Sequence, residues 1–560
     1  MDVGERQRKL SLWAEQLRMD AGQGLFKSRD DLRLYDLYHL IYEPTWLRLA
    51  HDRVAQNSGS ITAGCDGVNM AAFDENLEEN LQRLAEDLRS QTFRPTPVRR
   101  VWIPKKNGKL RPLGIPSIRD RIVQESLRMV LEPIFEAEFY AYSYGFRPNR
   151  STADALSMIV HNASNASRYF WVIEGDIKSY FDTIHHKKLM QLLRRRIRDD
   201  KLLTLVWHFL KAGVMEGTLF TPTTEGTPQG GIISPLLANV YLHELDTYMQ
   251  RRSQPSQNAK RIRRAHGRGN FAHIRYADDF VVMCNGTREE AEAMKRDIQN
   301  FLANELKLTL SDEKTKITHV NDGFRFLGYD IQRDVTGDGV RRVKLLIPQE
   351  AVAKVRASIL AVTAQSSLNH SLNAKLVAMN QLLRSWGQYY RYAYNASLVF
   401  AKLDHVVFWR MAHWIGAKFR SSIPQVLRCY YVQVEGVKTL SSGTKHLWLL
   451  RTLRHEYPPY RTFVNPYTTT QPLLIRAGGM VLPVWLGNEK RPGTLDLRPR
   501  VLARDGWTCQ HCGQVVTEET AALDHIRAVK RFRRPVDANT LDNLQTLCIP
   551  CHKQKTARGE

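Results

Sequence analysis

The sequence predicts an α+β protein with several domains, and three observations carry this prediction. The chain has 560 residues and is 43% hydrophobic, which allows about three to five domains with cores of their own. Strand and helix patterns alternate from Pro95 to about Asp330, and residues 350–420 are predominantly helical. Two C-x-x-C pairs near the C-terminus favour a small additional domain there.

Residues 1–50 are polar with a helical pattern, so they are predicted to form an N-terminal helical extension. Turn-forming residues gather at 57–67, and helical periodicity returns over 70–93. After residue 350, large apolar residues recur at spacings of three and four, and this stripe is predicted to face the core of its own region. The stripe consists of Leu372, Leu376, Met379, Leu383, Trp386 and Tyr390.

The last quarter of the chain begins with β-rich segments that hold many arginine and aromatic residues but no catalytic motif. We assign these segments to residues 426–492. Pro492-Gly493 and Pro499 mark a linker, because proline and glycine interrupt regular structure. Residues 493–560 are therefore predicted to form the last domain.

The charge balance points to a polyanionic partner. The chain has 81 Lys and Arg residues against 57 Asp and Glu residues, a net charge of +24. Nucleic acid is the leading partner for such an excess, and an anionic membrane surface is the alternative. No apolar run is long enough to span a bilayer, and the first residues lack the apolar stretch of a signal peptide. We therefore expect a cytoplasmic protein of the bacterial type.

Three cysteines lie apart from the C-terminal pairs and are predicted to be small buried core residues. They are Cys65, Cys284 and Cys429. A basic run over residues 260–268 is predicted to be a loop, either solvated or in contact with RNA or a template.

Two adjacent acids provide the first chemical signal. Asp278 and Asp279 lie in Tyr276-Ala277-Asp278-Asp279, between two apolar runs, a pattern typical of a β-hairpin with an acidic tip. Acids are common in turns without further function. However, two carboxylates held together repel each other, and a divalent cation relieves that conflict. Asp176 follows another apolar, strand-like run and is the candidate third ligand, whereas Asp182 lies too far along to join it.

Two further segments could serve a phosphate-bearing ligand. Residues 102–112 are predicted to form a hairpin that projects three lysines and an arginine. These cations could bind a triphosphate, or the hairpin could be a solvated basic turn without a ligand. Thr227-Pro228-Gln229-Gly230-Gly231 contains paired glycines that allow close approach of the backbone to a ligand. Ser234-Pro235 then has the pattern of a helix start.

Taken in order, these blocks resemble those of a reverse transcriptase. The blocks are the hairpin at 101–116, Tyr144-Gly145-Phe146-Arg147-Pro148, Gly175-Asp176-Ile177, the Pro-Gln-Gly-Gly loop, the Tyr-Ala-Asp-Asp tip, residues 311–316, and Phe326-Leu327-Gly328-Tyr329. The loop at 57–67 and the helical region after 350 narrow the resemblance to group II intron-encoded maturases. It covers roughly residues 50–420 and is specific, because seven blocks fall in order.

The resemblance implies a right-hand fold with fingers and palm over residues 51–345 and a helical thumb, called domain X, over residues 346–425. By the same resemblance, Asp176, Asp278 and Asp279 would hold two Mg²⁺ ions, with a contribution from the backbone carbonyl of Ile177.

The resemblance also assigns residues to the incoming dNTP. Phe181 would pack against the sugar and exclude a 2′-hydroxyl. Gln229 and Gly230 would line the pocket for nucleotide and template. Lys105, Lys109 and Arg111 would hold the triphosphate, and the choice between the two lysines stays open.

The second chemical signal is the C-terminal cysteine pattern. Four thiolates in two C-x-x-C pairs fit a tetrahedral Zn²⁺ site, and a four-cysteine site has no open position, so this zinc is predicted to be structural. The four residues are Cys509, Cys512, Cys548 and Cys551. Such a metal also stabilises a domain of this small size.

Four polar residues between and after these cysteines resemble an HNH nuclease with a ββα-metal fold. In that reading His525 is the general base that activates water, and Asp524 and His552 bind one divalent metal. Asn543 would orient His525 or its loop. The alternative is a DNA-binding zinc ribbon without catalysis.

Together these features predict a multifunctional intron protein. It would copy RNA into DNA, bind group II intron RNA so that the RNA splices, contact target DNA through residues 426–492, and nick that DNA to make a primer. One alternative is a splicing cofactor that has lost its chemistry. Another is a reverse transcriptase in defence or mutagenesis, which leaves the C-terminal module unexplained. The intron, the target and the oligomeric state are not specified by the sequence.

Overall fold

The structure is a computed structural model that describes most of the chain. The described residues are 2–22, 33–104, 108, 110–217, 219–227, 230–253, 257–335, 339–453, 455–462, 465–468, 474–477, 480–483, 501–502, 504–516, 520–526 and 543–557. The chain divides into two compact units, Met1–Pro459 and Tyr460–Glu560, and each is described by itself.

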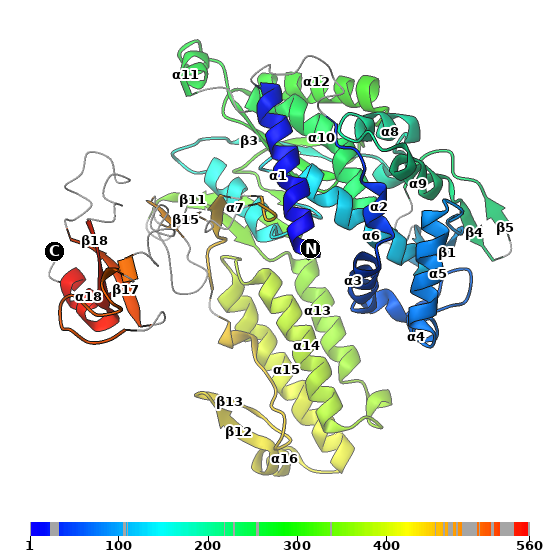
Figure 1. Cartoon of the computed structure of the whole chain (residues 1–560). Coiled ribbons are helices and arrows are strands. Elements are labelled where there is room, and N and C mark those ends of the chain that lie inside the picture. Colours follow the sequence, from blue (N-terminus) through cyan, green and yellow to red (C-terminus); the bar gives the residue numbers. More distant parts are fainter. Residues whose placement is uncertain are drawn as a thin grey trace. The chain divides into compact units, whose positions relative to one another are not determined.

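A four-stranded antiparallel sheet with the order β6-β7-β3-β8 lies at the centre of the first unit (Figure 1). The strands are β3 Trp171–Gly175, β6 Phe271–Tyr276, β7 Asp279–Cys284 and β8 Lys316–His319. The apolar residues 281–284 of β7 are all fully buried, as a continuous apolar run in a central strand predicts. We refer to this sheet as the palm sheet.

Helices pack against the palm sheet and against one another, and most of them share one hydrophobic core with it. They are α6 Ile118–Glu136, α7 Thr152–Asn162, the 3-10 helix η3 Tyr180–Asp182, α8 His186–Arg194, α9 Asp200–Lys211, α10 Ser234–Ser253 and α12 Arg288–Leu306. As predicted, Ser234 and Pro235 begin α10. A capping box formed by Thr287 and Glu290 begins α12.

The predicted basic hairpin is present in a second sheet with the order β2-β1-β4-β5. Its strands are β1 Val98–Pro104, β2 Leu110–Ile115, β4 Val214–Glu216 and β5 Leu219–Thr221. Arg111 pairs with Ile103 across the β1–β2 hairpin, and β4 extends the sheet in parallel with β1.

The described N-terminal residues are largely helical, as predicted. The elements are α1 Val3–Gly22, α2 Tyr38–Ile41, α3 Pro44–Ala55, the 3-10 helix η2 Ser58–Ile61, α4 Met70–Asp74 and α5 Leu77–Arg89. The side chain of Gln7 in α1 donates a 2.8 Å hydrogen bond to the carbonyl of Met129 in α6. This bond and the contacts between α1 and α6 attach the N-terminal helix to the core.

A three-stranded sheet, β11-β10-β9, leads from the palm sheet to the helices that follow. Its strands are β9 Phe324–Phe326, β10 Tyr329–Val335 and β11 Arg341–Leu346. The hydroxyl of Tyr389 donates a 2.7 Å hydrogen bond to the carbonyl of Leu327, and the backbone N–H of Tyr394 donates to Leu345 at 2.7 Å. These bonds fasten the next helices to the sheet.

Three long helices form an elongated lobe below the palm in Figure 1, and we call residues 349–453 the helical lobe. Its elements are α13 Gln349–Val362, the 3-10 helix η4 Gln365–Ser367, α14 Leu372–Tyr390, α15 Ala396–Phe419, α16 Ile423–Tyr430, β12 Tyr431–Val434, β13 Val437–Leu440 and the 3-10 helix η5 Leu450–Thr452. The apolar stripe of α14 faces the core as predicted, since Leu376, Met379 and Leu383 are fully buried.

The segment after α15 folds back on the helices. Asn380 of α14 bonds to the backbone of His446 and of Trp448, both at 2.8 Å. Asp404 of α15 accepts hydrogen bonds from the backbone N–H groups of Leu450 and Arg451. These bonds attach residues 446–451 to the helical lobe. The division between the compact units falls later, after Pro459, and thus inside the segment 426–492 for which the sequence predicts DNA contacts.

The second unit contains two small antiparallel sheets. The first, β14-β15-β16, comprises β14 Tyr460–Thr462, β15 Leu474–Ala477 and β16 Met480–Pro483. The second pairs β17 Ala521–His525 with β18 Leu544–Cys548, and α18 Ile549–Ala557 follows at once. This is the ββα arrangement that the sequence predicts for the C-terminal domain.

Two sequence predictions about single features are wrong. The basic run at 260–268 is not simply a loop, because most of it forms the helix α11 Gln257–Ala265, with Arg263 bonded to the carbonyl of Gly269. Cys284 is buried as predicted, but Cys65 and Cys429 are exposed. A lone cysteine carries no positional signal, so its burial depends on tertiary packing. Across the described residues, no helix is both long and apolar enough to cross a membrane.

Candidate active site and metal centres

The acidic tip is a tight turn between β6 and β7. Tyr276 pairs with Asp279, so Ala277 and Asp278 form a two-residue loop. Ala277 has φ 58°, in the left-handed region that two-residue hairpin loops require. Gly145 packs against this turn so closely that a Cβ there would lie 2.3 Å from the backbone nitrogen of Ala277. The sequence block around Gly145 thus supports the position of the acids directly.

A buried polar network lies behind the turn. The guanidinium of Arg275 donates to both carboxylate oxygens of Asp246, at 2.8 and 2.5 Å, and both side chains are fully buried. Arg275 also donates a 2.8 Å hydrogen bond to the carbonyl of Ala277 in the turn and a 2.9 Å hydrogen bond to the side-chain oxygen of Asn239. The network was not predicted from the sequence, because Asp246 and Asn239 lie on α10 without a motif of their own. An arginine inside an otherwise mostly apolar strand, Arg275, is the feature of the sequence that could have indicated a buried acidic partner.

Asp176 lies beside the tip on the neighbouring strand. Gly175 of β3 pairs with Phe280 of β7, so the residue after Gly175 comes next to Asp279. A Cβ at Gly175 would lie 2.2 Å from the Phe280 ring, which explains why glycine precedes the acid. The structure therefore brings Asp176, Asp278 and Asp279 together at one end of two adjacent strands.

The pKa values of Asp278 and Asp279 are both raised. Loss of hydration and then the charge of Asp176 raise the pKa of Asp278. Loss of hydration, together with the charges of Asp278 and Asp176, raises the pKa of Asp279 to about 6. Such mutual repulsion is what a bound cation relieves. The donor set, three carboxylates on rigid strands, fits the oxygen ligands that Mg²⁺ prefers.

Lys314 provides a cation at this cluster. Its Nζ lies 3.0 Å from both carboxylate oxygens of Asp176, and its charge lowers the pKa of Asp279. Lys314 belongs to the sequence block at 311–316, but no role was predicted for it. The pairing depends on the backbone bond from Ser311 N–H to the Asp176 carbonyl, 2.8 Å, which only tertiary folding creates.

Two predicted nucleotide residues lie near the acids. Arg111 of β2 is close enough that its charge lowers the pKa of Asp278. Gly230 has φ 115°, and a Cβ there would lie 2.5 Å from the carbonyl of Gly114 in β2. The glycine loop and the basic hairpin are thus in direct contact. Lys105, Lys109 and Gln229 lie outside the described residues.

Phe181 and Ile177 are held in the core beside the acids. Phe181 is buried, meets Phe146 edge to face with ring centres 6.5 Å apart, and accepts a 2.7 Å hydrogen bond from the N–H of Thr227 through its carbonyl. Ile177 is also buried and forms an isolated bridge with Leu310. The ring of Phe181 is thereby fixed between the β3 end and the glycine loop.

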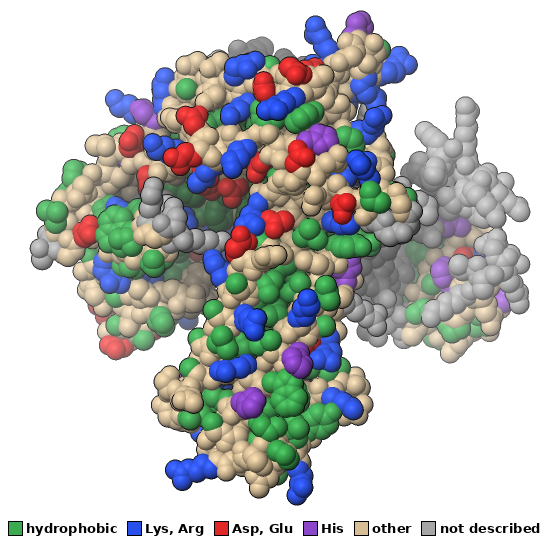
Figure 2. All heavy atoms as spheres, turned by 180° about the vertical axis from the view of Figure 1, so that it is seen from behind, with side chains coloured by type: hydrophobic (Ala, Val, Ile, Leu, Met, Phe, Trp, Pro, Cys, Tyr) green, Lys and Arg blue, Asp and Glu red, His purple; other side chains and the backbone are tan. Residues whose placement is uncertain are grey.

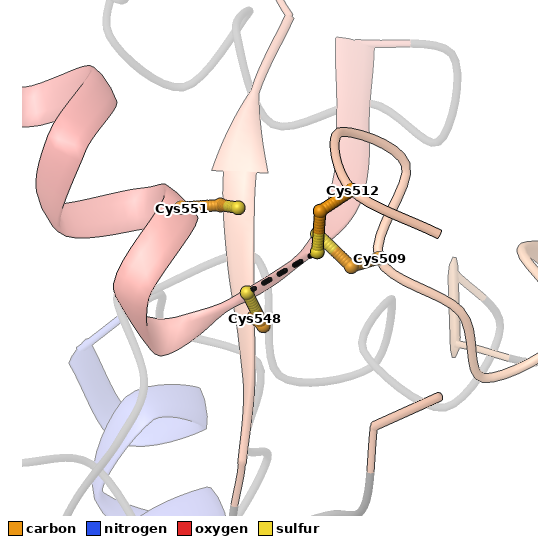
Figure 3. Close-up of side chains that lie close together, drawn as sticks. All are labelled: Cys509, Cys512, Cys548 and Cys551. Atoms are coloured by element: carbon orange, nitrogen blue, oxygen red, sulfur yellow. Dashed lines mark hydrogen bonds between the residues drawn. The ribbon is translucent and has the colours of Figure 1, made fainter. Parts of the chain in front are cut away.

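The four C-terminal cysteines converge as the sequence predicts. Figure 3 shows Cys551 on the helix, Cys548 at the strand end, and Cys509 and Cys512 on a loop, with all four side chains close together. Their Sγ atoms all lie within 4.8 Å of one another, and those of Cys512 and Cys548 are 3.8 Å apart. This cluster fits a tetrahedral zinc site.

The thiols have unequal pKa values. Burial raises the pKa of Cys509, but hydrogen bonds from backbone N–H groups outweigh it and lower that pKa to about 6. The neighbouring Cys548 thiol raises the pKa of Cys551 to about 12. Because zinc binds thiolates, loading the cluster must release the protons of the thiols that are still protonated, Cys551 and Cys512 among them.

The predicted nuclease residues lie on the ββα elements. Asp524 and His525 end β17, and His552 on α18 has its Nε2 4.0 Å from Oδ1 of Asp524, a pair that fits one shared metal ion. The other Asp524 oxygen accepts from Lys555 at 2.5 Å and from Gln545 at 2.9 Å. Lys555 was not predicted, and its i+3 position after His552 on the helix is the signal that could have indicated it.

Asn543 and Lys555 hold the backbone around His525. The carbonyl of Asn543, a buried residue, accepts a 2.8 Å bond from the N–H of Ile526, and Lys555 donates 2.8 Å to the carbonyl of His525. The prediction left open whether Asn543 orients His525 or its loop. The backbone bond does not involve the Asn543 side chain, so the role of that side chain stays a prediction.

Comparison with known proteins places these sites in families. Residues 103–331 match the reverse transcriptase (RNA-dependent DNA polymerase) model, residues 352–431 the group II intron maturase-specific domain, and residues 509–558 the HNH endonuclease. The three matches follow the order of the palm sheet, the helical lobe and the ββα domain.

Several curated proteins are similar to the chain. Protein YkfC of Escherichia coli K12 is 42% identical over 380 residues, which are 65% of this chain and 97% of that protein. The group II intron-encoded protein LtrA of Lactococcus lactis is 36% identical over 343 residues, 53% of this chain and 56% of LtrA. The putative COX1/OXI3 intron 2 protein of Saccharomyces cerevisiae is 27% identical over 441 residues, 67% of this chain and 51% of that protein. The match thus spans about half the length of the two intron proteins.

The fold and the sites define a multidomain protein with a reverse transcriptase domain and an HNH endonuclease domain. With the maturase-specific domain between them, the chain belongs to the group II intron-encoded proteins.

Proposed function

We propose that this chain is an RNA-directed DNA polymerase, a splicing maturase and a DNA-nicking endonuclease that together move a group II intron. The observation that carries the polymerase activity is the convergence of Asp176, Asp278 and Asp279 at one sheet end, with Arg111 acting electrostatically on the same cluster. A polymerase needs acids for metal and cations for triphosphate in one place.

In this proposal Asp176, Asp278 and Asp279 hold two Mg²⁺ ions. When bound, these ions neutralise the carboxylates and stabilise charge on the phosphoryl group during transfer. Arg111, with Lys105 and Lys109, holds the triphosphate of the dNTP, and Gln229 and Gly230 line its pocket. The fixed ring of Phe181 packs against the sugar and leaves no room for a 2′-hydroxyl.

The maturase activity rests on the helical lobe and on the net charge of +24. A basic protein binds the phosphates of folded RNA through many contacts, so its affinity falls with salt as counterions are released. In this proposal the helical lobe and neighbouring basic surfaces bind the intron RNA and stabilise its splicing-competent fold.

The nuclease activity rests on the ββα domain. Asp524 and His552 hold one divalent ion, His525 takes a proton from the attacking water, and the four cysteines hold a structural zinc. Residues 426–492 contact the target DNA. Nicking leaves a 3′-hydroxyl, which the palm then extends on the RNA template.

Primer extension on an RNA template and nicking of duplex DNA test the two activities separately. Asp278→Ala abolishes Mg²⁺-dependent extension and leaves RNA binding and nicking intact. His525→Ala stops nicking, retains zinc and leaves extension intact. If the wild-type protein binds RNA but neither extends nor nicks, the chain is a splicing cofactor without chemistry and the proposal is wrong.

A further inference from the structure

A cavity of about 450 Å³ lies on the helical lobe, and none of the proposed polymerase or nuclease residues lines it. Five elements supply its walls: α15, α16, β12, β13 and η5. The lining residues are His405, Phe408, Trp409, Leu427, Tyr431, Lys438 and Arg451. This volume is within the range of roughly 300–1,000 Å³ that is usual for sites of small organic groups. We call it the lobe pocket.

The aromatic residues of the lobe pocket leave ring surface uncovered. Trp409 is 37% exposed and Tyr431 39% exposed. Both meet Phe408 edge to face, at interplanar angles of 86° and 87°. Among the described residues, no ring stacks face to face on Trp409 or Tyr431. Phe408 is half-buried between these two rings, whereas packing does not account for the exposed faces of Trp409 and Tyr431.

The pocket is also basic. Lys438 is exposed, and Arg451 is half-exposed at the rim. The fully buried Asp404 fixes Arg451, because it accepts bonds from the Arg451 backbone N–H at 2.9 Å and from its Nε at 3.1 Å. The view in Figure 2 shows the same mixture on the lobe, where hydrophobic side chains lie among histidine and Lys or Arg.

Flat apolar faces beside fixed cations suit a base joined to phosphates. An aromatic ring stacks on any base, and the cations pair with the neighbouring phosphates. Single-stranded RNA offers such unstacked bases in its loops and bulges, whereas the bases of a duplex target are already stacked. His405, Phe408, Trp409, Leu427 and Tyr431 also lie within the match to the maturase-specific domain, residues 352–431.

We propose that the lobe pocket binds one unstacked base of single-stranded RNA, with Trp409 and Tyr431 stacking on it and Lys438 and Arg451 pairing with the adjacent phosphates. The inference rests on the proposed RNA-binding function and adds a defined site to it. The lobe would thereby recognise a single-stranded feature of the RNA and not only its charge.

The test uses the full-length protein and a fluorescein-labelled, unstructured single-stranded RNA, with binding measured by fluorescence anisotropy. Trp409→Ala weakens binding about five- to hundredfold, the range for losing one stacked base. Trp409→Phe keeps a ring and retains most of the affinity. Equal losses in the two variants contradict stacking. Phe419→Ala, an exposed aromatic on the same helix outside the pocket, is the matched control, and an equal loss there overturns the site.

A second variant keeps the proposal testable if Trp409→Ala unfolds in a melting experiment. Lys438→Ala lies on the exposed strand and reduces the slope of log affinity against log salt by about one, as the loss of one phosphate contact requires. An unchanged slope overturns the phosphate assignment.

Two further outcomes distinguish a failure of the proposed maturase function from a failure of the lobe pocket alone. If the wild-type protein does not bind the RNA, the proposed maturase function fails. If the wild type binds and Trp409→Ala binds equally well, only the lobe pocket fails. A single-stranded DNA of the same sequence is measured in parallel, and a loss confined to that DNA overturns RNA as the occupant.

Discussion

Arg275 and Asp246 form a fully buried, two-point ion pair directly behind the turn that carries Asp278 and Asp279. The same guanidinium donates to the carbonyl of Ala277 in that turn. The pair thus connects α10 to the acidic tip, and its integrity should decide both stability and the position of the acids.

Asp246→Ala should destabilise the first unit by about 3–5 kcal/mol, because it leaves the Arg275 charge buried without a partner. Thermal unfolding measured alongside primer extension checks this, with both the melting temperature and the extension rate expected to fall. Asp334→Ala is the control, since it removes an exposed carboxylate that pairs with Lys344, and it should cost much less. Equal effects of the two variants would show that burial is not the cause.

Asp279→Asn should raise the melting temperature at neutral pH when divalent ions are chelated. The folded protein raises the pKa of Asp279 from 3.8 to about 6, so between these values the folded state binds more protons than the unfolded state. Stability therefore falls as pH rises through this window, and the penalty is complete above it. The amide removes the penalty, so its advantage should shrink between about pH 7 and about pH 5. A constant advantage would point to another cause.

The same acids make Mg²⁺ binding depend on pH. Because the metal needs ionised carboxylates, the midpoint for Mg²⁺ in primer extension should move to higher concentration as pH falls toward the Asp279 value of about 6. Titrations of Mg²⁺ at several pH values measure this. A midpoint independent of pH contradicts the assignment of Asp279 as a ligand.

Gly145→Ala should impair the polymerase site selectively. Its Cβ would lie 2.3 Å from the Ala277 nitrogen, so the turn must shift, at a cost of about 1–3 kcal/mol for overpacking. We expect slower primer extension and unchanged DNA nicking. Gly59→Ala is the control, because nothing lies within 4 Å of a Cβ at that position.

Removing zinc should abolish nicking and spare the polymerase. Cys548→Ser or a strong chelator should unfold the small ββα domain, since the core that its described residues form is a small cluster around Cys509 and Cys548. Limited proteolysis and metal analysis detect this, with primer extension as the internal reference. Cys429→Ser, at an exposed single cysteine, should change neither activity. Nicking that survives complete zinc loss would overturn a structural role for the metal.

Local patterns in the sequence predict the parts of this protein whose geometry is local. The Tyr-Ala-Asp-Asp hairpin, the strand before Asp176, the basic hairpin and the start of α10 were all predicted from periodicity and turn residues. The apolar stripe of α14 was predicted from its spacing. The cysteine cluster was predicted because zinc ligands have a characteristic separation.

Contacts made only by tertiary folding escaped prediction. Lys314 pairs with Asp176 across 138 residues, and Asp246 pairs with Arg275 across 29 residues from a different element. Neither side chain carries a signal of its own. The helix α11 was not predicted because a run of basic residues has no stripe of large apolar residues to mark helical periodicity. Cys65 and Cys429 were misplaced because residue type alone does not determine burial.

The pairing of Lys314 with Asp176 has a consequence for how the palm changes between states. The Lys314 side chain is 66% exposed and sits on a flexible stem, so moving it aside needs no rearrangement of the core. Its ammonium acts as a tethered counter-ion that stays with the acids when no other cation is present. If the acids hold Mg²⁺ as proposed, binding of the metal exchanges one positive charge for another, and the sheet need not hold three unpaired carboxylates before the metal arrives.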